Sequence, residues 1–354
     1  MTSPIEIGPI TQITGGPVAS KPNLKIPLAN SYNERGITGF THAITNSESQ
    51  RKLNCMYEIT KNAVTGSGTV TLTKRPGVVD TTFSIGAAGQ VAYFAVVPPN
   101  GKAGNQPWVF STLGNDVRVS DSTTTQVLFS SGSGYAPCFI DRTLISNADT
   151  IILQTTVTAN SDTAQRVFFS SGASAGAAFT EITDGDFTSL VHRGKMEPMD
   201  GYEFVLDSMN RIFNSDVNSL SSWNPTNFIT KQIKQDYPLG LARLNNQILA
   251  FGQDTVEMFY NAGNASGSPL SSIRQLHQRI GLGATIPVNS PYYTIVDNKL
   301  FLCATVSNSR SIYAYDGSSF SRVGNSYIDK ILNGGFFGIF SIGFGGQYGV
   351  AVQL

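Results

Sequence analysis

The chain has 354 residues and a mass of 37.9 kDa, which is enough for one large domain or two ordinary ones. Only 14% of its residues are charged and 35 are glycine, a composition typical of short strands joined by glycine-containing turns and not of a helical protein. Lysine plus arginine and aspartate plus glutamate number 24 each, and this balance argues against binding that depends on neutralising nucleic-acid phosphates.

The three cysteines, Cys55, Cys138 and Cys303, are far apart and fit neither a disulfide framework nor a paired metal-ligand motif. We expect them to be small buried side chains in a protein made in a reducing cytoplasm. The N-terminus lacks the charged segment and apolar core of a signal peptide, and no apolar run is long enough to span a bilayer. The sequence therefore predicts a soluble protein that is intracellular when it is made.

Residues 1–49 combine prolines and glycines with scattered isoleucines and leucines. Prolines and glycines at this density resist a regular helix or a central strand. The interspersed apolar residues favour an extended arm that docks on a neighbour over free disorder. We expect residues 50–354 to form a separate β domain, because strand-like runs and turns follow one another from there with little interruption.

The stretch Leu239–Gly263 contains three such runs, joined by the two-residue turns Asn245–Asn246 and Gln253–Asp254. Asparagine and aspartate tolerate the positive φ of tight hairpins, so this stretch predicts an antiparallel meander. Ile248–Phe251 is apolar at every position, which indicates that both faces of the middle strand are covered. Beyond it, Ser271–Arg279 predicts a short helix or an irregular crossover.

Residues 291–323 give the clearest unit, four strands with Asp297–Asn298 and Asp316–Gly317 as turns. Similar units recur at roughly 40–50 residues, the period of propeller blades. We therefore predict an all-β fold, a β-propeller of about six blades of antiparallel strands with an extended N-terminal arm; five or seven blades also fit. The alternative, two β-sandwiches, would show more alternating strands and a central linker.

Residues able to carry chemistry are sparse. His42, His192 and His277 have no partner at metal-ligand spacing, and no nucleophile elbow or phosphate loop occurs. A propeller glycosidase would need a pair of carboxylates. The candidates are Asp184, Asp186, Asp200, Glu203, Asp207, Asp216 and Glu257. The Asp184–Asp186 stretch fits a turn, and Asp207 and Asp216 fit strand ends, better than a catalytic pair. Glu257 is the exception, because it lies inside an apolar strand. We expect a structural partner for it, such as Arg243 on a neighbouring strand, or an interface contact.

Aromatic residues could line a face that binds a glycan or a protein, although blade packing is the commoner use of such residues. The candidates are Trp108, Trp223, Tyr292, Tyr293, Tyr313 and Tyr315.

Three ordered blocks resemble the packaged-DNA stabilisation, or tail hub (nozzle), proteins of short-tailed double-stranded DNA phages. The blocks are Gln50, Arg51, Asn54, Tyr57 and Glu58 with Arg75–Gly77; Arg211–Asp216 with Trp223, Phe228 and Leu239–Ala242; and Leu249–Gly263 with Gly281, Pro287 and Val296–Asn298. This resemblance implies a structural virion protein with no enzymatic activity and no cofactor or metal. The implied assembly is a ring, expected to be a hexamer, below the portal adaptor protein.

The resemblance further implies that packaged DNA passes through the ring's channel without sequence-specific binding, and that tail fibre or spike proteins attach to it. The last blade is expected to be incomplete, or to be closed by an N-terminal strand such as Thr69–Thr73, by another chain or by a further C-terminal segment. The residues expected to serve packing or interfaces are Arg243, Glu257, Tyr260, Asn261, Asn264, Arg274 and His277. The alternative functions are a receptor- or glycan-binding propeller and, third, a glycoside hydrolase.

Overall fold

The computed structural model describes residues 25–27, 55–61, 68–74, 94–97, 108–113, 116–120, 125–130, 135–146, 148–157, 166–170, 178–283, 291–307, 309–324, 326–333, 338–344 and 347–353. Contacts divide the chain into two compact units, Met1–Asp80 and Thr81–Leu354. The boundary expected at residue 50 stays a prediction.

The first unit contains one antiparallel sheet of three strands in the order β1-β3-β2. Its strands are β1 (Lys25–Pro27), β2 (Cys55–Lys61) and β3 (Gly68–Lys74). The segment Thr69–Thr73, expected to close the last blade, lies in β3. Within this sheet β3 pairs with β2 along its whole length and with β1 over Thr71–Thr73. Closure of the last blade by this segment stays a prediction.

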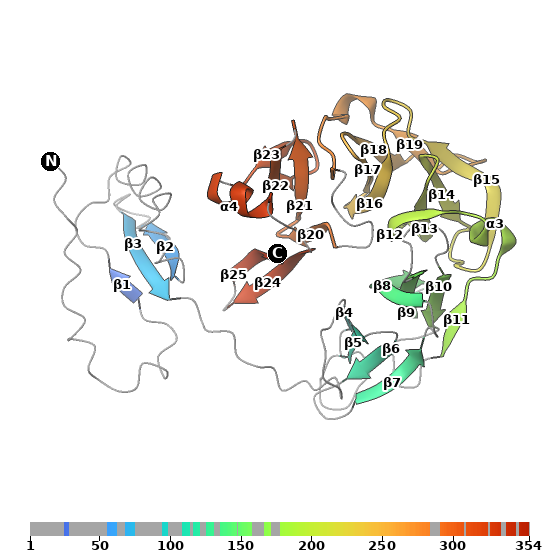
Figure 1. The fold of residues 1–354 in the computed structure, drawn as a ribbon, viewed down its shortest axis with the longest axis horizontal. Coiled ribbons are helices and arrows are strands. Elements are labelled where there is room, and N and C mark those ends of the chain that lie inside the picture. Colours follow the sequence, from blue (N-terminus) through green and yellow to red (C-terminus); the bar gives the residue numbers. More distant parts are fainter. Residues whose placement is uncertain are drawn as a thin grey trace. The chain divides into compact units, whose positions relative to one another are not determined.

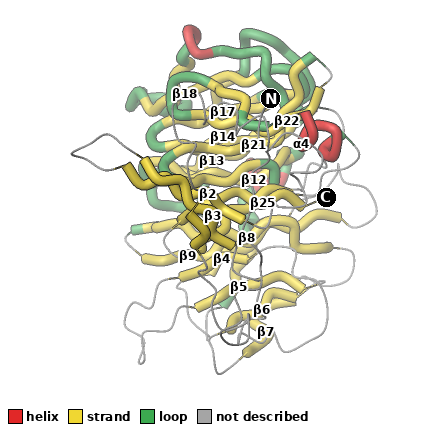
Figure 2. The backbone as a smooth tube through the Cα atoms, turned by 90° about the vertical axis from the view of Figure 1, so that its left-hand side faces the viewer, coloured by secondary structure: helices red, strands yellow, loops and turns green. Residues whose placement is uncertain are grey.

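The second unit contains five sheets of four antiparallel strands and one of two, numbered here as sheets 1 to 6 in chain order (Figures 1 and 2). Sheet 1 consists of β4 (Phe94–Val97), β5 (Trp108–Leu113), β6 (Asp116–Ser120) and β7 (Thr125–Ser130). Sheet 2 consists of β8 (Tyr135–Ile145), β9 (Ala148–Val157), β10 (Arg166–Ser170) and β11 (Phe179–Glu181). Sheet 3 consists of β12 (His192–Met199), β13 (Tyr202–Asp207), β14 (Arg211–Ser215) and β15 (Trp223–Thr230).

Sheet 4 consists of β16 (Pro238–Leu244), β17 (Gln247–Gly252), β18 (Val256–Asn261) and β19 (Leu270–Ser272). Sheet 5 consists of β20 (Tyr293–Val296), β21 (Lys299–Val306), β22 (Ser309–Tyr315) and β23 (Phe320–Arg322). Sheet 6 consists of β24 (Gly338–Phe344) and β25 (Gln347–Gln353). In each of the first five sheets the strands follow chain order from one edge to the other. Sheets 4 and 5 confirm the predicted meander and the predicted four-stranded unit.

Local turn chemistry explains why these strands pair in chain order. Asn245, between β16 and β17, has φ 54°, and Asp297 and Asn298, between β20 and β21, have φ 48° and 58°. These are the left-handed values that asparagine and aspartate adopt at little cost in tight hairpins. The expected irregular crossover contains the short 3₁₀ helix η3 (Arg274–Leu276), and no described helix is long and apolar enough to cross a membrane.

Each sheet of the second unit packs face to face on the next, so that the sheets follow one another around a common centre (Figure 1). Buried clusters join sheets 1 and 2 through Phe110 and Ile140, sheets 2 and 3 through Val167 and Val205, and sheets 3 and 4 through Phe204 and Ile248. A fourth cluster joins sheet 4 to sheet 5 and extends to Ile339 of sheet 6. Sheets covered on both faces explain the strands that are apolar throughout.

Candidate functional site

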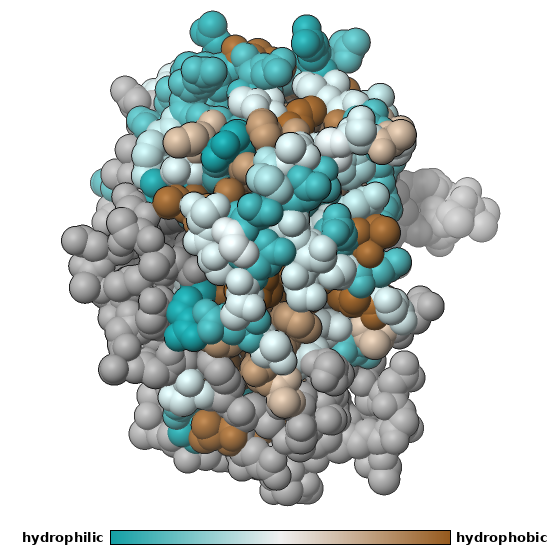
Figure 3. Space-filling model, turned by 90° about the vertical axis from the view of Figure 1, so that its right-hand side faces the viewer, coloured by the Kyte–Doolittle hydropathy of each residue, from teal (hydrophilic) through white to brown (hydrophobic). Residues whose placement is uncertain are grey.

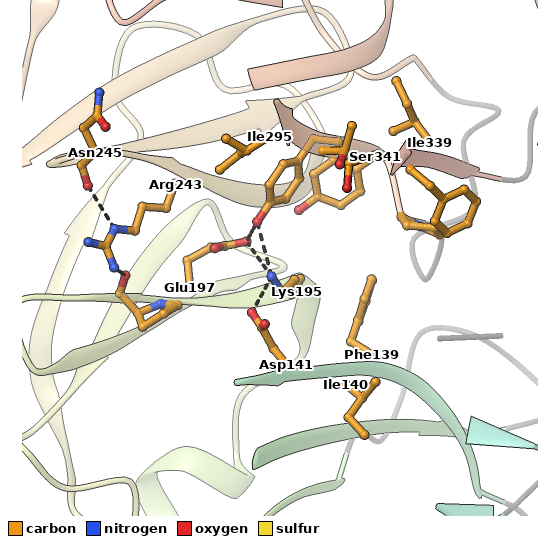
Figure 4. Close-up of a pocket in the computed structure, with 16 residues that line it drawn as sticks. Phe139, Ile140, Asp141, Lys195, Glu197, Arg243, Asn245, Ile295, Ile339 and Ser341 are labelled. Carbon is orange, nitrogen blue, oxygen red and sulfur yellow. Dashed lines mark hydrogen bonds and ion pairs between the residues drawn. The ribbon is translucent and has the colours of Figure 1, made fainter. Parts of the chain in front are cut away.

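A cavity of about 680 Å³ lies where the first strands of sheets 2 to 6 meet. Its walls carry charged and aromatic side chains beside apolar ones (Figure 4). The lining residues are Phe139, Ile140, Asp141, Lys195, Glu197, Pro198, Arg243, Asn245, Pro291, Tyr292, Tyr293, Thr294, Ile295, Ile339, Phe340 and Ser341. A concave site of this size with both polar and apolar walls is a natural place to look for function.

Lys195 is the centre of a polar network inside this cavity. Its Nζ lies 2.5 Å from Asp141 Oδ2 of sheet 2, 3.8 Å from Glu197 Oε1, and donates to the Tyr293 hydroxyl of sheet 5 at 3.3 Å. The Tyr293 hydroxyl in turn donates to Glu197 Oε1 (Figure 4). Tyr293 and Glu197 come from sheets that are not consecutive, so their contact spans the centre around which the sheets are arranged.

A β-bulge places Lys195 and Glu197 in this position. The pairing of β12 with β13 shifts register between Arg193 and Glu197, and Gly194 at the bulge has φ 71°. A Cβ on Gly194 would lie 2.6 Å from the Cα of Gly240, so β12 and β16 approach too closely for a side chain there. Bulges commonly redirect side chains in this way at functional positions.

Burial and mutual charge shift the pKa of each group in the network. Burial raises the pKa of Glu197 to about 7, although the charge of Lys195 opposes the change. Burial alone would lower the pKa of Lys195, but the carboxylates of Asp141 and Glu197 hold it well above its usual value. Burial also raises the pKa of Tyr293. The amine therefore stays charged, and the Tyr293 phenol stays protonated and able to donate.

Arg243 lines the same cavity but forms a different link. Its Nε donates to the backbone oxygen of Asn245 at 2.9 Å, and its Nη1 donates to the backbone oxygen of Pro198 at 2.6 Å. The second bond joins sheet 4 to sheet 3. Arg243 is not the partner of Glu257, so that expectation is wrong.

Glu257 instead binds backbone amides of the β15–β16 connection. Its Oε1 accepts from the N–H groups of Ile233 at 2.8 Å and Lys234 at 3.3 Å, and its Oε2 accepts from Gln232 at 3.1 Å. Glu257 is buried in β18, and β17 separates this strand from β16, which carries Arg243. Its predicted role as a structural carboxylate is thus supported, with different partners.

The other expected interface residues lie in or after sheet 4. Tyr260 is 42% exposed, and Arg274 is exposed on η3. Asn261 donates from Nδ2 to Asp200 Oδ2 at 2.8 Å, and Asn264 donates to the backbone oxygens of Ser268 and Leu270 at 3.0 and 3.1 Å. His277 is partly buried. None of these five lines the central cavity, so the structure does not unite them with Arg243 in one site.

Asp184 and Asp207 serve as a cap and a turn partner, as expected, whereas Glu203 is buried inside β13. Asp184 caps α3 (Gly185–Thr188) by accepting from the backbone N–H groups of Asp186 and Phe187, and Asp207 binds Arg211. Of the aromatic candidates, Trp223, Tyr292 and Tyr315 are buried, as expected for packing, whereas the side chain of Trp108 lies outside the described ones.

Sequence reasoning missed the roles of Lys195, Glu197 and Asp141. The available signal was the alternation of Lys195 and Glu197, which puts two charges on one face of a strand that is otherwise buried. Their partner Tyr293 is almost a hundred positions away, and only the folded ring brings it near. Among the described residues, no group of three or more His, Cys, Asp or Glu side chains is arranged to hold a metal ion.

Sheets of antiparallel strands that pack face to face in chain order around a centre filled with side chains define a β-propeller. Residues 144–335 match the model of the family described as "Bacteriophage P22 Gp10, beta-propeller". The match covers more than half of the chain, and the chain belongs to this family. It is accordingly a phage structural protein.

Other comparisons add little. No curated protein sequence matches the chain. Among solved structures, it is similar to BBS1N in complex with ARL6DN (11% identity, 84% of this chain and 82% of that chain, TM-score 0.47). It is also similar to YCF48 bound to D1 peptide (10%, 85% and 87%, 0.43) and to BamB from Moraxella catarrhalis (12%, 65% and 64%, 0.37). At these TM-scores the likenesses carry no argument.

Proposed function

We propose that the chain is a subunit of the tail hub, or nozzle, of a short-tailed phage. In this role a ring of copies continues the DNA channel below the portal and its adaptor, retains the packaged genome and anchors tail fibres or spikes. The observation that carries the proposal is the family match over residues 144–335, which includes β9 to β23. The site of action is the virion tail, after synthesis in the cytoplasm of the host bacterium, and the role requires no catalysis.

The central network supports a channel formed between copies and not through one propeller. Tyr293 and Glu197 are in hydrogen-bonding contact across the centre, and Lys195 is bound to both sides. A DNA duplex has no path between side chains in direct contact. The channel for DNA would instead lie at the centre of a ring of copies, expected to number six. Such a ring forms when one contact between neighbouring copies is repeated by rotation until it closes.

Exposed apolar side chains supply surfaces for such contacts at both ends of the sheets. One end of each sheet carries the connections between its first and second strands and between its third and fourth strands; the exposed apolar residues at this end are Leu144, Val217, Tyr260 and Ile295. The opposite end carries the connections between second and third strands and from one sheet to the next; the exposed apolar residues there are Met209, Ile233, Tyr237 and Val323. On the face shown in Figure 3, the apolar residues form separate spots among hydrophilic ones. A surface with small apolar spots among hydrophilic residues suits an assembly whose subunits are stable as separate molecules before they assemble.

The direct test is the mass of the purified full chain, measured by native mass spectrometry, with and without its portal adaptor. We expect a discrete ring of about six copies that binds the adaptor ring. A strict monomer that fails to join the adaptor would contradict the proposal. Binding of that monomer to a glycan array would favour the receptor-binding alternative, and turnover of a chromogenic glycoside would favour the hydrolase.

A further inference from the structure

Glu203, next to the Lys195 network, is a carboxylate without a hydrogen-bond partner. Glu203 lies in β13 opposite Pro198 of β12 and is 0% exposed. Neither carboxylate oxygen has a hydrogen bond of normal geometry, although the Thr143 hydroxyl is near enough to favour the charged form. The backbone N–H of Glu203 donates to Ser215 Oγ at 3.0 Å, so the strand that carries it is fixed.

Glu203 lines a small internal cavity between sheets 2 and 3. The cavity measures about 10 Å³, room for one water-sized particle. Its polar lining residues are Asp141, Thr143, Gln154 and Glu203, and the remainder of the wall is Phe139, Ile152, Met196 and Pro198. A polar cavity of this size is normally filled, whereas apolar cavities stay empty.

The charges around the cavity are not balanced. Three carboxyl groups, those of Asp141, Glu197 and Glu203, lie in this region together with one amine, that of Lys195. The Lys195 amine is already paired with Asp141 and Glu197. The nearby guanidinium of Arg243 donates to backbone oxygens. An unpaired carboxylate in the interior is strongly unfavourable, so the position beside Glu203 requires a positive charge or a proton.

We propose that a monovalent metal cation of the size of Na⁺ occupies this cavity, bound by Glu203 and by oxygens of Thr143, Gln154 and Asp141. Hard cations prefer such oxygen ligands. The Gln154 side-chain oxygen accepts from the Met196 N–H at 2.8 Å, which fixes the amide in the cavity wall. A divalent ion fits less well, because the described residues offer no group of three acidic, His or Cys ligands.

The cation has a structural consequence, since it would hold β8 and β9 of sheet 2 to β13 of sheet 3 near the centre of the propeller. Thermal unfolding of the full chain at equal ionic strength in sodium, potassium or choline chloride tests this. We expect the melting temperature to be higher in sodium chloride than in choline chloride, by on the order of 2 °C, because an ion bound only to the folded state stabilises it by mass action.

The variant Glu203→Gln should abolish this difference between salts. Glu257→Gln is the matched control: it alters another buried glutamate, whose oxygens accept from backbone amides, and should leave the response to salt intact. A high-resolution crystal structure obtained in sodium chloride should show a peak beside Glu203 whose distances to the oxygens of Glu203 and Asp141 are shorter than hydrogen bonds. Equal melting temperatures in all three salts for the unaltered chain would overturn the proposal and favour a proton on Glu203. A crystal map without such a peak would also overturn it, even if Glu203→Gln does not fold.

Discussion

Glu257 Oε1 accepts a hydrogen bond from the backbone N–H of Ile233 at 2.8 Å, so that a buried strand of sheet 4 holds the connection arriving from sheet 3. The same carboxylate binds the N–H groups of Gln232 and Lys234. Successive backbone amides facing one point form an anion-binding concavity. Here the anion is supplied by the protein itself, and the interaction fixes the chain between two blades.

Glu257→Gln should therefore destabilise the protein by about 1–3 kcal/mol, because charge-assisted bonds are lost and an amide N–H group then faces backbone donors. Guanidinium unfolding of the purified chain measures the change. Asp254→Asn is the control, since its pair with Lys234 is exposed and its loss should cost less than about 1 kcal/mol. Equal stability of the Glu257 variant and the unaltered chain would refute the capping role.

The buried pair of Lys231 and Asp236 predicts sensitivity to acid. Burial alone would raise the pKa of Asp236, but bonds from Lys231 and from the backbone N–H of Asp254 lower it below 3.8. A carboxyl whose pKa is lower in the folded state stabilises it above the unfolded pKa, and this contribution is lost as the pH falls through the folded value. Asp236→Asn should thus unfold more readily at neutral pH and show a shallower loss of stability below pH 4.

Urea unfolding of both forms at several pH values tests that expectation. A parallel acid limb in Asp236→Asn and the unaltered chain would show that Asp236 does not govern it.

The opposite sign applies to Glu197, whose pKa is raised from 4.5 to about 7. A carboxyl with a raised pKa holds more protons in the folded than in the unfolded state, so its contribution declines as the pH rises from 4.5 through 7. Glu197→Gln, which keeps an acceptor for the Tyr293 hydroxyl, should flatten this decline. Melting temperatures measured from pH 5 to pH 8 provide the comparison, and an unchanged slope in the variant would count against this assignment.

These cases show which features the sequence predicts and which it does not. The hairpins of sheets 4 and 5 were predictable because their turns carry local signals, such as Asn245 with its positive φ. The contact of Tyr293 with Glu197 was not, since it depends on the arrangement of the sheets around the centre of the propeller and not on pairing between neighbouring strands. The expectation for Arg243 was wrong because of strand order: Arg243 lies in β16 and Glu257 in β18, and β17 lies between these two strands. The partners of Glu257 are backbone N–H groups, which nearly every residue has, so the sequence does not indicate which of them bind it.

Gly281 lies so close to the backbone of the Gln253–Asp254 turn that a side chain at this position should destabilise the fold. A Cβ at this position would lie 2.2 Å from the backbone oxygen of Gln253 and 2.4 Å from the N of Asp254. Because backbone atoms in a paired turn cannot move aside cheaply, Gly281→Ala should cost about 1–3 kcal/mol or more. Gly185→Ala is the control, since nothing lies within 4 Å of its Cβ position. Urea denaturation should separate the two variants, and a similar midpoint for both would contradict the argument.

Tyr260 tests the proposed assembly without disturbing the fold. Its side chain is 42% exposed at the end of β18, so Tyr260→Ala should leave the melting temperature of the single subunit nearly unchanged. If this end of the sheets forms the contact between copies, the truncation should weaken the ring by about tenfold or more, since aromatic anchors dominate interfaces. Met209→Ala, at the opposite end and 68% exposed, is the matched control. Mass photometry over a range of concentrations would measure both variants, and a ring weakened only by the Met209 change would place the contact at the other end.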